Sequence, residues 1–120
     1  MITAFGGRAH LYARPQTREP LRKFFADVLG TAAQEIPGTT MLVCRMAEGT
    51  SVSVEFTSDA LDDLHGLRGA WLELRTDDPA ELQRRVMAAG LRRVEHPVTG
   101  RFYFRSPDGQ VWGISELCSS

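Results

Sequence analysis

The sequence predicts an α+β domain in which one pattern, a strand followed by a helix and three more strands, occurs twice. Alternating apolar and polar residues mark the strands, and two segments repeat apolar residues at helical spacing. Glycines stand in the breaks between these segments. A chain of 120 residues is long enough to bury one core but not two independent ones. We therefore expect a single domain, residues 1–120, with modules at about 8–57 and 69–117.

The first module begins with residues 8–14, whose alternation is typical of a half-buried strand. A helix is expected over residues 17–30, with Thr17 as its N-cap and Gly30 as its end. Its apolar stripe consists of Leu21, Phe24, Phe25, Val28 and Leu29. Three strands are expected at residues 32–36, 40–46 and 51–56.

The second module follows a polar connection at residues 57–69 and repeats the pattern. Residues 70–76 predict a strand, and residues 77–90 predict a helix that opens with Asp78 as N-cap and Pro79 in the first position. Three strands are expected at residues 91–97, 101–106 and 110–116. Aligning the first strands pairs His10 with Trp71 and Arg14 with Arg75. We interpret the repeat as an internal duplication; the alternative is one α+β domain whose halves agree by chance.

Composition and charge narrow the functional classes. The formal net charge is −1 and no basic run occurs, so we expect no nucleic acid and no anionic membrane as partner. The first ten residues lack the pattern of a signal peptide, and no apolar stretch is long enough to span a bilayer, so we expect a cytoplasmic protein. Cys44 is expected to be a buried, unreactive thiol and Cys118 to be peripheral.

Four of the predicted strands carry polar and aromatic residues on the face that does not pack against the helices. Large aromatic residues mixed with charged and small ones favour a concave site for an organic ligand. The alternative is a solvated outer face or a dimer contact. Trp112 is expected in the core, whereas Phe102, Phe104 and Tyr103 leave open which face of their strand lines the cavity. The face contains His10, Tyr12, Arg14, Ser51, Ser53, Glu55, Trp71, Glu73, Arg75, Val111, Gly113 and Ser115.

Three stretches, "AHLYA…PLRKFFADVLG", "LELRTDDPAELQRRVMAAG" and "FYFRSPDGQVWGISE", occur in this order over nearly the whole chain. With them the sequence resembles the vicinal oxygen chelate superfamily, which includes glyoxalase I, extradiol dioxygenases and the fosfomycin and bleomycin resistance proteins. The resemblance implies two βαβββ modules that form an incomplete barrel around a cavity, the glyoxalase/bleomycin resistance fold. It also implies a homodimer.

Metal-dependent members of the superfamily bind a divalent metal with residues of the first and last strands of each module. The resemblance assigns these four positions to His10, Glu55, Trp71 and Gly113. Trp71 has no lone pair to donate and Gly113 has no side chain, so only His10 and Glu55 remain, fewer than the three ligands usual in catalytic sites. We expect Trp71 to offer a stacking surface and Gly113 to leave room beside it.

The predicted function is metal-independent binding of a small organic molecule, such as an aromatic antibiotic or metabolite that is sequestered without reaction. No cofactor is expected. The alternative is a metal-dependent lyase, isomerase or dioxygenase with an atypical ligand set, and a metal-independent reaction with His10 and Glu55 as a proton-transfer pair also stays open. The predicted ligand-binding residues are His10, Tyr12, Arg14, Ser53, Glu55, Trp71, Glu73, Arg75 and Gly113.

Overall fold

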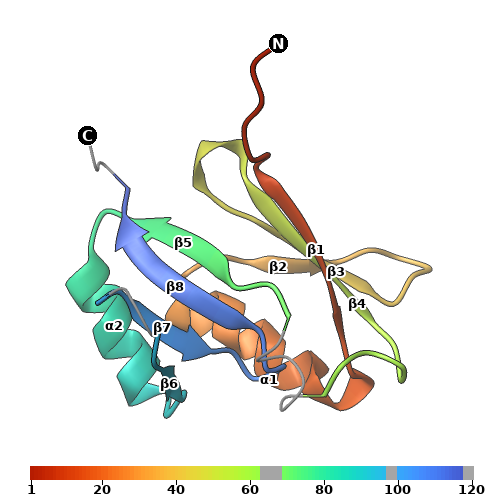
Figure 1. Ribbon diagram of the computed structural model, residues 1–120. Coiled ribbons are helices and arrows are strands. Elements are labelled where there is room, and N and C mark those ends of the chain that lie inside the picture. The colour runs from red at the N-terminus through yellow and green to blue at the C-terminus, as the bar shows by residue number, and fades with distance from the viewer. Residues whose placement is uncertain (63–68, 97–99, 118–120) are drawn as a thin grey trace.

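The computed structural model describes residues 1–62, 69–96 and 100–117 and contains two four-stranded sheets (Figure 1). The first sheet has the order β1-β4-β3-β2, and the second has the order β5-β8-β7-β6. The first sheet consists of β1 (Arg8–Ala13), β2 (Ala33–Glu35), β3 (Met41–Arg45) and β4 (Ser51–Phe56). The second consists of β5 (Leu72–Thr76), β6 (Arg93–Val94), β7 (Phe102–Arg105) and β8 (Val111–Glu116).

The two sheets have the same topology, which confirms the repeat of a strand, a helix and three strands. In each sheet the first strand pairs in parallel with the last strand of its module, β1 with β4 and β5 with β8. The other pairings are antiparallel. Both sheets are open, and the strand expected over residues 91–97 is reduced to the two residues of β6.

The helices lie where the apolar stripes predict them. The first module has a continuous helical run of η1 (Pro15–Thr17), α1 (Arg18–Lys23) and η2 (Phe24–Val28). In η2 the amide of Leu29 donates to the carbonyl of Phe24 over 3.1 Å, five residues back, which widens this turn. The hydroxyl of Thr17 donates to the carbonyl of Arg14, so Thr17 makes no side-chain cap.

Helix α2 (Pro79–Ala88) begins as the sequence predicts. The Asp78 carboxylate accepts a hydrogen bond of 3.1 Å from the amide of Glu81, and Pro79 takes the first helical position. This capping satisfies one of the amides that a helix N-terminus leaves unpaired. Gly90, with φ of +72°, follows the last turn, where a residue with a side chain would be strained.

One hydrophobic core contacts both helices and the helix-facing sides of both sheets. The ring of Phe24 lies 5.9 Å from that of Phe104 and 6.4 Å from that of Trp112, so the helical run of the first module packs against β7 and β8 of the second (Figure 1). Cys44 and Trp112 are buried in this core, as expected. The polar faces of the two sheets therefore point away from it.

Two of the sequence predictions concern residues that the structure does not describe, and a third concerns membrane-spanning segments. Cys118 lies outside the described residues, as do residues 63–68 of the connection expected between the modules. Within residues 1–62, 69–96 and 100–117, no helix has the length and apolar character needed to cross a lipid bilayer.

The turn between β7 and β8 is tied to the core through Trp112. The indole Nε1–H of Trp112 donates to the hydroxyl of Ser106 over 2.9 Å, and the Ser106 hydroxyl donates to the carboxyl group of Asp108. The amide of Gly109, whose φ is +92°, donates to the carbonyl of Ser106 and closes the turn. Burial raises the pKa of Asp108, and the hydrogen bond from Ser106 opposes this rise.

The raised pKa of Asp108 predicts a pH-dependent contribution to stability. The folded state binds this proton more tightly than the unfolded chain does, so the contribution is full below the unfolded pKa of about 3.9 and is lost as pH rises through the raised folded pKa. As pH rises through this range, we expect the free energy of unfolding of the wild type to fall relative to that of Asp108→Asn. Denaturant unfolding of both proteins at a series of pH values measures it, with Asp77→Asn, at an exposed site, as the control for loss of one carboxyl. A constant difference between wild type and Asp108→Asn would contradict the prediction.

Candidate ligand-binding site

The polar face of the first sheet brings together four of the predicted site residues. His10 and Ser53 are opposite each other in the parallel ladder between β1 and β4, and Nδ1 of His10 lies 2.6 Å from the Ser53 hydroxyl oxygen. Tyr12 meets the His10 ring edge-on at 5.0 Å, and Glu55 is opposite Tyr12 in the same ladder. Tyr12 is 57% exposed, so this face is open to solvent in the single chain.

The polar face of the second sheet carries a cavity of about 410 Å³, here called the sheet pocket. All of its lining residues belong to the second module, and three of them, Trp71, Glu73 and Gly113, are predicted site residues. The lining consists of Trp71, Leu72, Glu73, His96, Arg101, Tyr103 and Gly113.

Gly113 in β8 is covered by the ring of Tyr103 rather than by empty space. Tyr103 in β7 is its partner in the antiparallel ladder. A β-carbon added to Gly113 would lie 2.6 Å from Cε1 of Tyr103 and 3.0 Å from Cδ1, closer than such atoms can approach. The glycine thus permits the tyrosine ring to approach the strand closely. The room that the sequence suggested at this position is occupied by Tyr103.

Three rings in mutual contact form one wall of the sheet pocket; we call Trp71, His96 and Tyr103 the aromatic cluster. His96 stacks on Tyr103 at 5.3 Å with an interplanar angle of 21°. Trp71 lies 5.3 Å from Tyr103 and 5.8 Å from His96 in tilted and edge-on arrangements. Each ring restricts the others, so the wall is held in place before a ligand arrives.

An ion pair stands beside the aromatic cluster. A guanidinium nitrogen of Arg101 lies 3.1 Å from a carboxylate oxygen of Glu73, and their side chains are 56% and 49% exposed. Exposed pairs of this kind contribute about 0.2–1 kcal/mol to stability. Because so little stability depends on this ion pair, Glu73 and Arg101 can separate and bind polar groups of a ligand instead.

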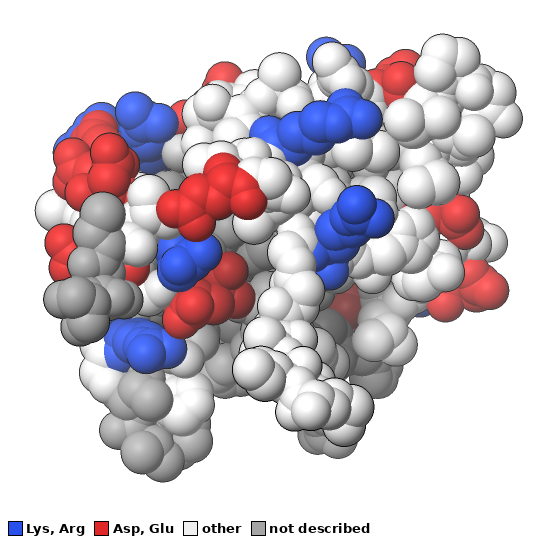
Figure 2. Space-filling model, turned by 90° about the horizontal axis from the view of Figure 1, so that it is seen from above, with Lys and Arg blue, Asp and Glu red and all other residues white. Residues whose placement is uncertain are grey.

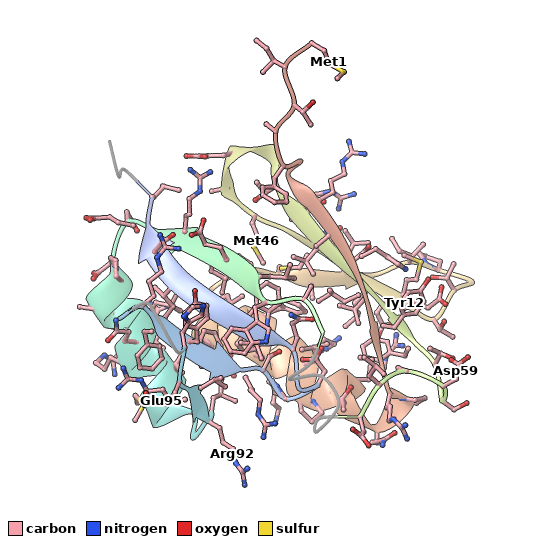
Figure 3. All side chains as sticks on the ribbon, viewed as in Figure 1. Met1, Tyr12, Met46, Asp59, Arg92 and Glu95 are labelled. Carbon is pink, nitrogen blue, oxygen red and sulfur yellow. The ribbon has the colours of Figure 1, made fainter. Side chains whose placement is uncertain are left out.

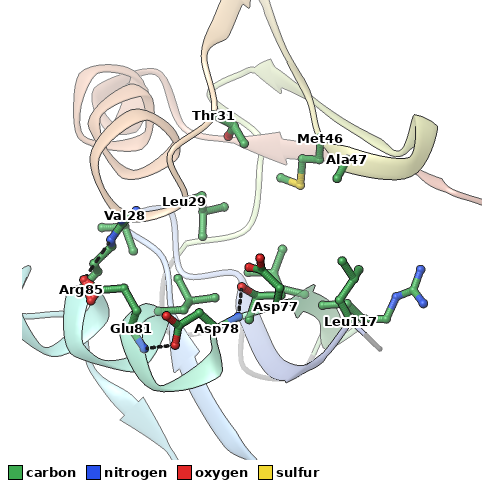
Figure 4. Close-up of a pocket in the computed structure, with 14 residues that line it drawn as sticks. Val28, Leu29, Thr31, Met46, Ala47, Asp77, Asp78, Glu81, Arg85 and Leu117 are labelled. Carbon is green, nitrogen blue, oxygen red and sulfur yellow. Dashed lines mark hydrogen bonds and ion pairs between the residues drawn. The ribbon is translucent and has the colours of Figure 1, made fainter. Parts of the chain in front are cut away.

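Two predicted site residues serve other purposes. Nε of Arg14 donates to the carbonyl of Ala60 over 2.9 Å and holds the segment after β4 against the end of β1. Arg75 pairs with Glu48 of η3 (Ala47–Gly49) at 3.0 Å, which links the second sheet to the first module. Arg75 lines a different cavity, the intermodule groove of about 540 Å³ (Figure 4). Neither arginine lines the sheet pocket.

The residues present do not fit the metal site that the resemblance implies. Of the four ligand positions, only His10 and Glu55 carry side chains that can donate to a metal; Trp71 has no donor lone pair, and Gly113 has no side chain and lies under Tyr103. Within the described residues, no three His, Cys, Asp or Glu side chains gather as they would around a metal ion. Catalytic metal sites in proteins usually take about three protein ligands.

Sequence reasoning missed His96 and Arg101 as pocket residues and left open whether Tyr103 lines the cavity. Tyr103 could have been found, because alternation along β7 places it opposite the buried Phe104 and on the face of Gly113. His96 and Arg101 lie outside the strands. Residues outside regular elements show no periodicity that would report the direction of their side chains.

Positive and negative side chains are interleaved on the surface. Figure 2 shows Lys and Arg next to Asp and Glu on the face seen from above. The ion pairs Arg75–Glu48 and Arg84–Glu81 are examples of this compensation. Charges of opposite sign on this face partly cancel one another's field.

No family model matches the sequence, and a search of curated proteins finds no match. Solved structures do match. A protein from the mobile metagenome of V. pseudocholerae has 21% identity and a TM-score of 0.70, with 99% of this chain and 98% of that chain covered. A putative glyoxalase family protein from Bacillus anthracis has 13% identity and a TM-score of 0.73, with 95% and 97% covered. The fosfomycin resistance protein FosX from Listeria monocytogenes has 11% identity and a TM-score of 0.67, with 95% and 91% covered.

These similarities extend over nearly the whole chain, and at such low identity they establish the fold. The chain has the α+β fold of glyoxalase and fosfomycin resistance proteins, members of the vicinal oxygen chelate superfamily. The resemblance seen in the sequence is confirmed at the level of the fold.

Proposed function

We propose that this protein binds a small organic molecule with a planar aromatic ring in the sheet pocket, without a metal, and sequesters it without chemical conversion. The observation that carries the proposal is the aromatic cluster of Trp71, His96 and Tyr103 around a cavity of about 410 Å³. Pockets of roughly 300–1,000 Å³ accept metabolite- and drug-sized ligands. An antibiotic or an aromatic metabolite falls within this class.

The chemistry of the lining supports an aromatic ligand with a polar substituent. The rings offer stacking surface, which contributes about 0.5–1.5 kcal/mol beyond the area buried. The neighbouring Glu73–Arg101 pair offers one acceptor and one donor group to a substituent on the ligand ring. The ring and its substituent would thus be recognised by different parts of the lining.

Binding without reaction is supported by what the pocket contains. Among the described lining residues there is no serine, threonine or cysteine, and the one hydroxyl beside His96 is the phenol of Tyr103, whose ring stacks on the imidazole at 5.3 Å. His10 and Glu55, the pair that could transfer a proton, lie on the first sheet. A reaction would need groups from both sheets to meet at one ligand.

We further propose that the protein is a cytoplasmic homodimer in which the polar face of the first sheet of one copy covers the sheet pocket of the other. In a single chain both faces are uncovered, and the sheet pocket is bounded by the second module alone. Tyr12, 57% exposed, would then lose its solvent contact.

Replacing Trp71 with alanine is expected to weaken binding of an aromatic probe about tenfold, because one ring of the aromatic cluster is lost and the other two lose their support. The measurement is titration with 1-anilinonaphthalene-8-sulfonate, followed by the fluorescence of the probe. Met87→Ala is the matched control, because it removes an exposed apolar side chain on α2, away from the pocket. Equal affinity of Trp71→Ala and Met87→Ala for the probe would contradict the proposal.

The second candidate function is a metal-dependent lyase, isomerase or dioxygenase, which the placement of His10 and Glu55 on one face of adjacent strands favours. We expect protein purified without chelator to contain less than one tenth of an equivalent of Mn, Fe, Ni or Zn by elemental analysis, since two protein ligands are too few for a dependable site. A stoichiometric metal that is lost in His10→Ala would establish the second function instead.

A further inference from the structure

We propose that the intermodule groove binds an amphipathic organic cation, a molecule that carries one protonated amine on an apolar body of metabolite or drug size. The groove and the sheet pocket share no lining residue. This inference therefore concerns a second site and does not rest on the function proposed for the sheet pocket.

Both modules contribute apolar side chains to the groove. Figure 3 shows Met46 between the two sheets, and Figure 4 shows Leu29, Met46 and Leu117 around the same opening. These three side chains are only half-buried in the single chain, so an apolar body in the groove of about 540 Å³ would remove apolar surface from water. The complete apolar lining consists of Val28, Leu29, Met46, Leu74, Leu82 and Leu117.

Carboxylates outnumber guanidinium groups in the lining of the groove. Its charged residues are Asp77, Asp78, Glu81, Arg75 and Arg85. Each arginine already has a carboxylate partner, because Arg75 pairs with Glu48 at 3.0 Å and Nε of Arg85 lies 3.6 Å from a carboxylate oxygen of Glu81. The two positive charges of the groove are therefore compensated.

Asp77 supplies a carboxylate that can pair with a ligand. Asp78 accepts a hydrogen bond of 3.1 Å from the amide of Glu81 at the N-terminus of α2, where a negative charge is favoured. Among the described residues, by contrast, no hydrogen bond or ion pair reaches the side chain of Asp77. Figure 4 shows this carboxylate directed into the space bordered by Leu29 and Met46. A protonated amine placed there would gain an ion pair, and no existing pair would have to break.

Other classes of ligand fit the groove less well. An anion would face Asp77 and Asp78, and it would have to draw Arg75 or Arg85 away from its carboxylate partner. A neutral apolar molecule would displace water from beside the Asp77 carboxylate without replacing it by a partner. A cation with an apolar body matches both the charged and the apolar parts of the lining.

Isothermal titration calorimetry with decylammonium chloride, kept below its micelle concentration, measures this binding. We expect Asp77→Asn to weaken the affinity about fivefold, the loss that corresponds to one partly exposed ion pair. Asp59→Asn is the matched control, because it removes an exposed carboxylate that does not line the groove, and Figure 3 shows Asp59 beyond the end of β4, away from Met46. A wild type that does not bind decylammonium, or equal affinities of the two variants, would overturn the proposal.

The sign of the ligand charge is tested with decanoate, which has a chain of the same length and the opposite charge. We expect decanoate to bind the wild type roughly tenfold more weakly than decylammonium does, and this ratio to shrink in Asp77→Asn. Equal affinities of the wild type for the two probes would mean that the groove takes up apolar chains regardless of charge, which also contradicts the proposal.

Two further variants locate the bound cation. Ala47 is exposed and lines the groove, so Ala47→Trp should fill the groove and abolish decylammonium binding. Trp71→Ala removes part of the aromatic cluster, and decylammonium should still bind to this variant. The opposite result would place the ammonium group on the aromatic rings and overturn the proposal. If the aromatic probe failed to bind in the sheet pocket, decylammonium binding would be unaffected, which separates this inference from the proposed function.

Discussion

Gly113→Ala is expected to lower the free energy of unfolding by about 1–3 kcal/mol, the usual cost of forcing an extra methyl group into a packed site. The new β-carbon would lie 2.6 Å from Cε1 of Tyr103, so the tyrosine ring must move. In a strand without such a neighbour, alanine would be the better residue, by roughly 0.5–1 kcal/mol. The steric cost exceeds this gain, so the net effect is destabilising.

Denaturant unfolding measures the effect, and Gly100→Ala is the matched control. A β-carbon at Gly100 meets no described atom within 4 Å. Adding Tyr103→Ala to Gly113→Ala should recover the loss caused by the clash, with a coupling energy of about 0.5–3 kcal/mol. If Gly113→Ala and Gly100→Ala behaved alike, Tyr103 would not be held over the strand.

The same pair of residues has a consequence for binding. Because Tyr103 stacks on His96 and contacts Trp71, a ring displaced by Gly113→Ala disturbs all three members of the aromatic cluster. The metal-ligand position that the resemblance assigns to Gly113 therefore lies under an aromatic ring. The glycine here makes room for the tyrosine ring and does not leave an empty place.

Trp112→Ala is expected to cost about 3–5 kcal/mol of stability, the range for removing a large aromatic side chain from a core. Trp112 is 2% exposed and packs 6.4 Å from Phe24. Its indole N–H also donates to Ser106, which is itself buried, so the variant leaves that hydroxyl without this partner. The measurement is equilibrium denaturation followed by circular dichroism.

Trp71→Ala is the matched comparison, because it removes the same side chain from the half-buried polar face. We expect it to cost clearly less stability than Trp112→Ala while it weakens binding of the aromatic probe. The comparison thus distinguishes a tryptophan that stabilises the core from one that contributes to ligand binding. Equal losses of stability would mean that Trp71 belongs to the folding core and that the sheet pocket is a by-product of packing.

Much of the fold could be predicted from local pattern. The helical stripe around Phe24 and the cap at Asp78 depend on residues close in sequence, and both are confirmed. The edge strand β6 is shorter than predicted, because among the described residues 91–96 only Arg93 and Val94 pair with β7. Cys44 and Trp112 were correctly placed in the core, because alternation within a strand reports its buried face.

The candidate site was predictable only in part. Trp71, Glu73 and Gly113 do lie together at the sheet pocket, whereas Arg14 and Arg75 bind elsewhere. Long arginine side chains reach partners on other elements, so the face of the strand does not determine where the guanidinium lies.

By itself the sequence determined the two modules, their strands and helices, and which side of each strand is buried, because these follow from the spacing of apolar residues along the chain. The tertiary structure decided how the modules pack, with Phe24 against the second sheet. It also decided that Tyr103 covers Gly113 and that His96 joins Trp71. These contacts join residues of separate elements, and their geometry depends on ring orientation and strand register, which no local periodicity records.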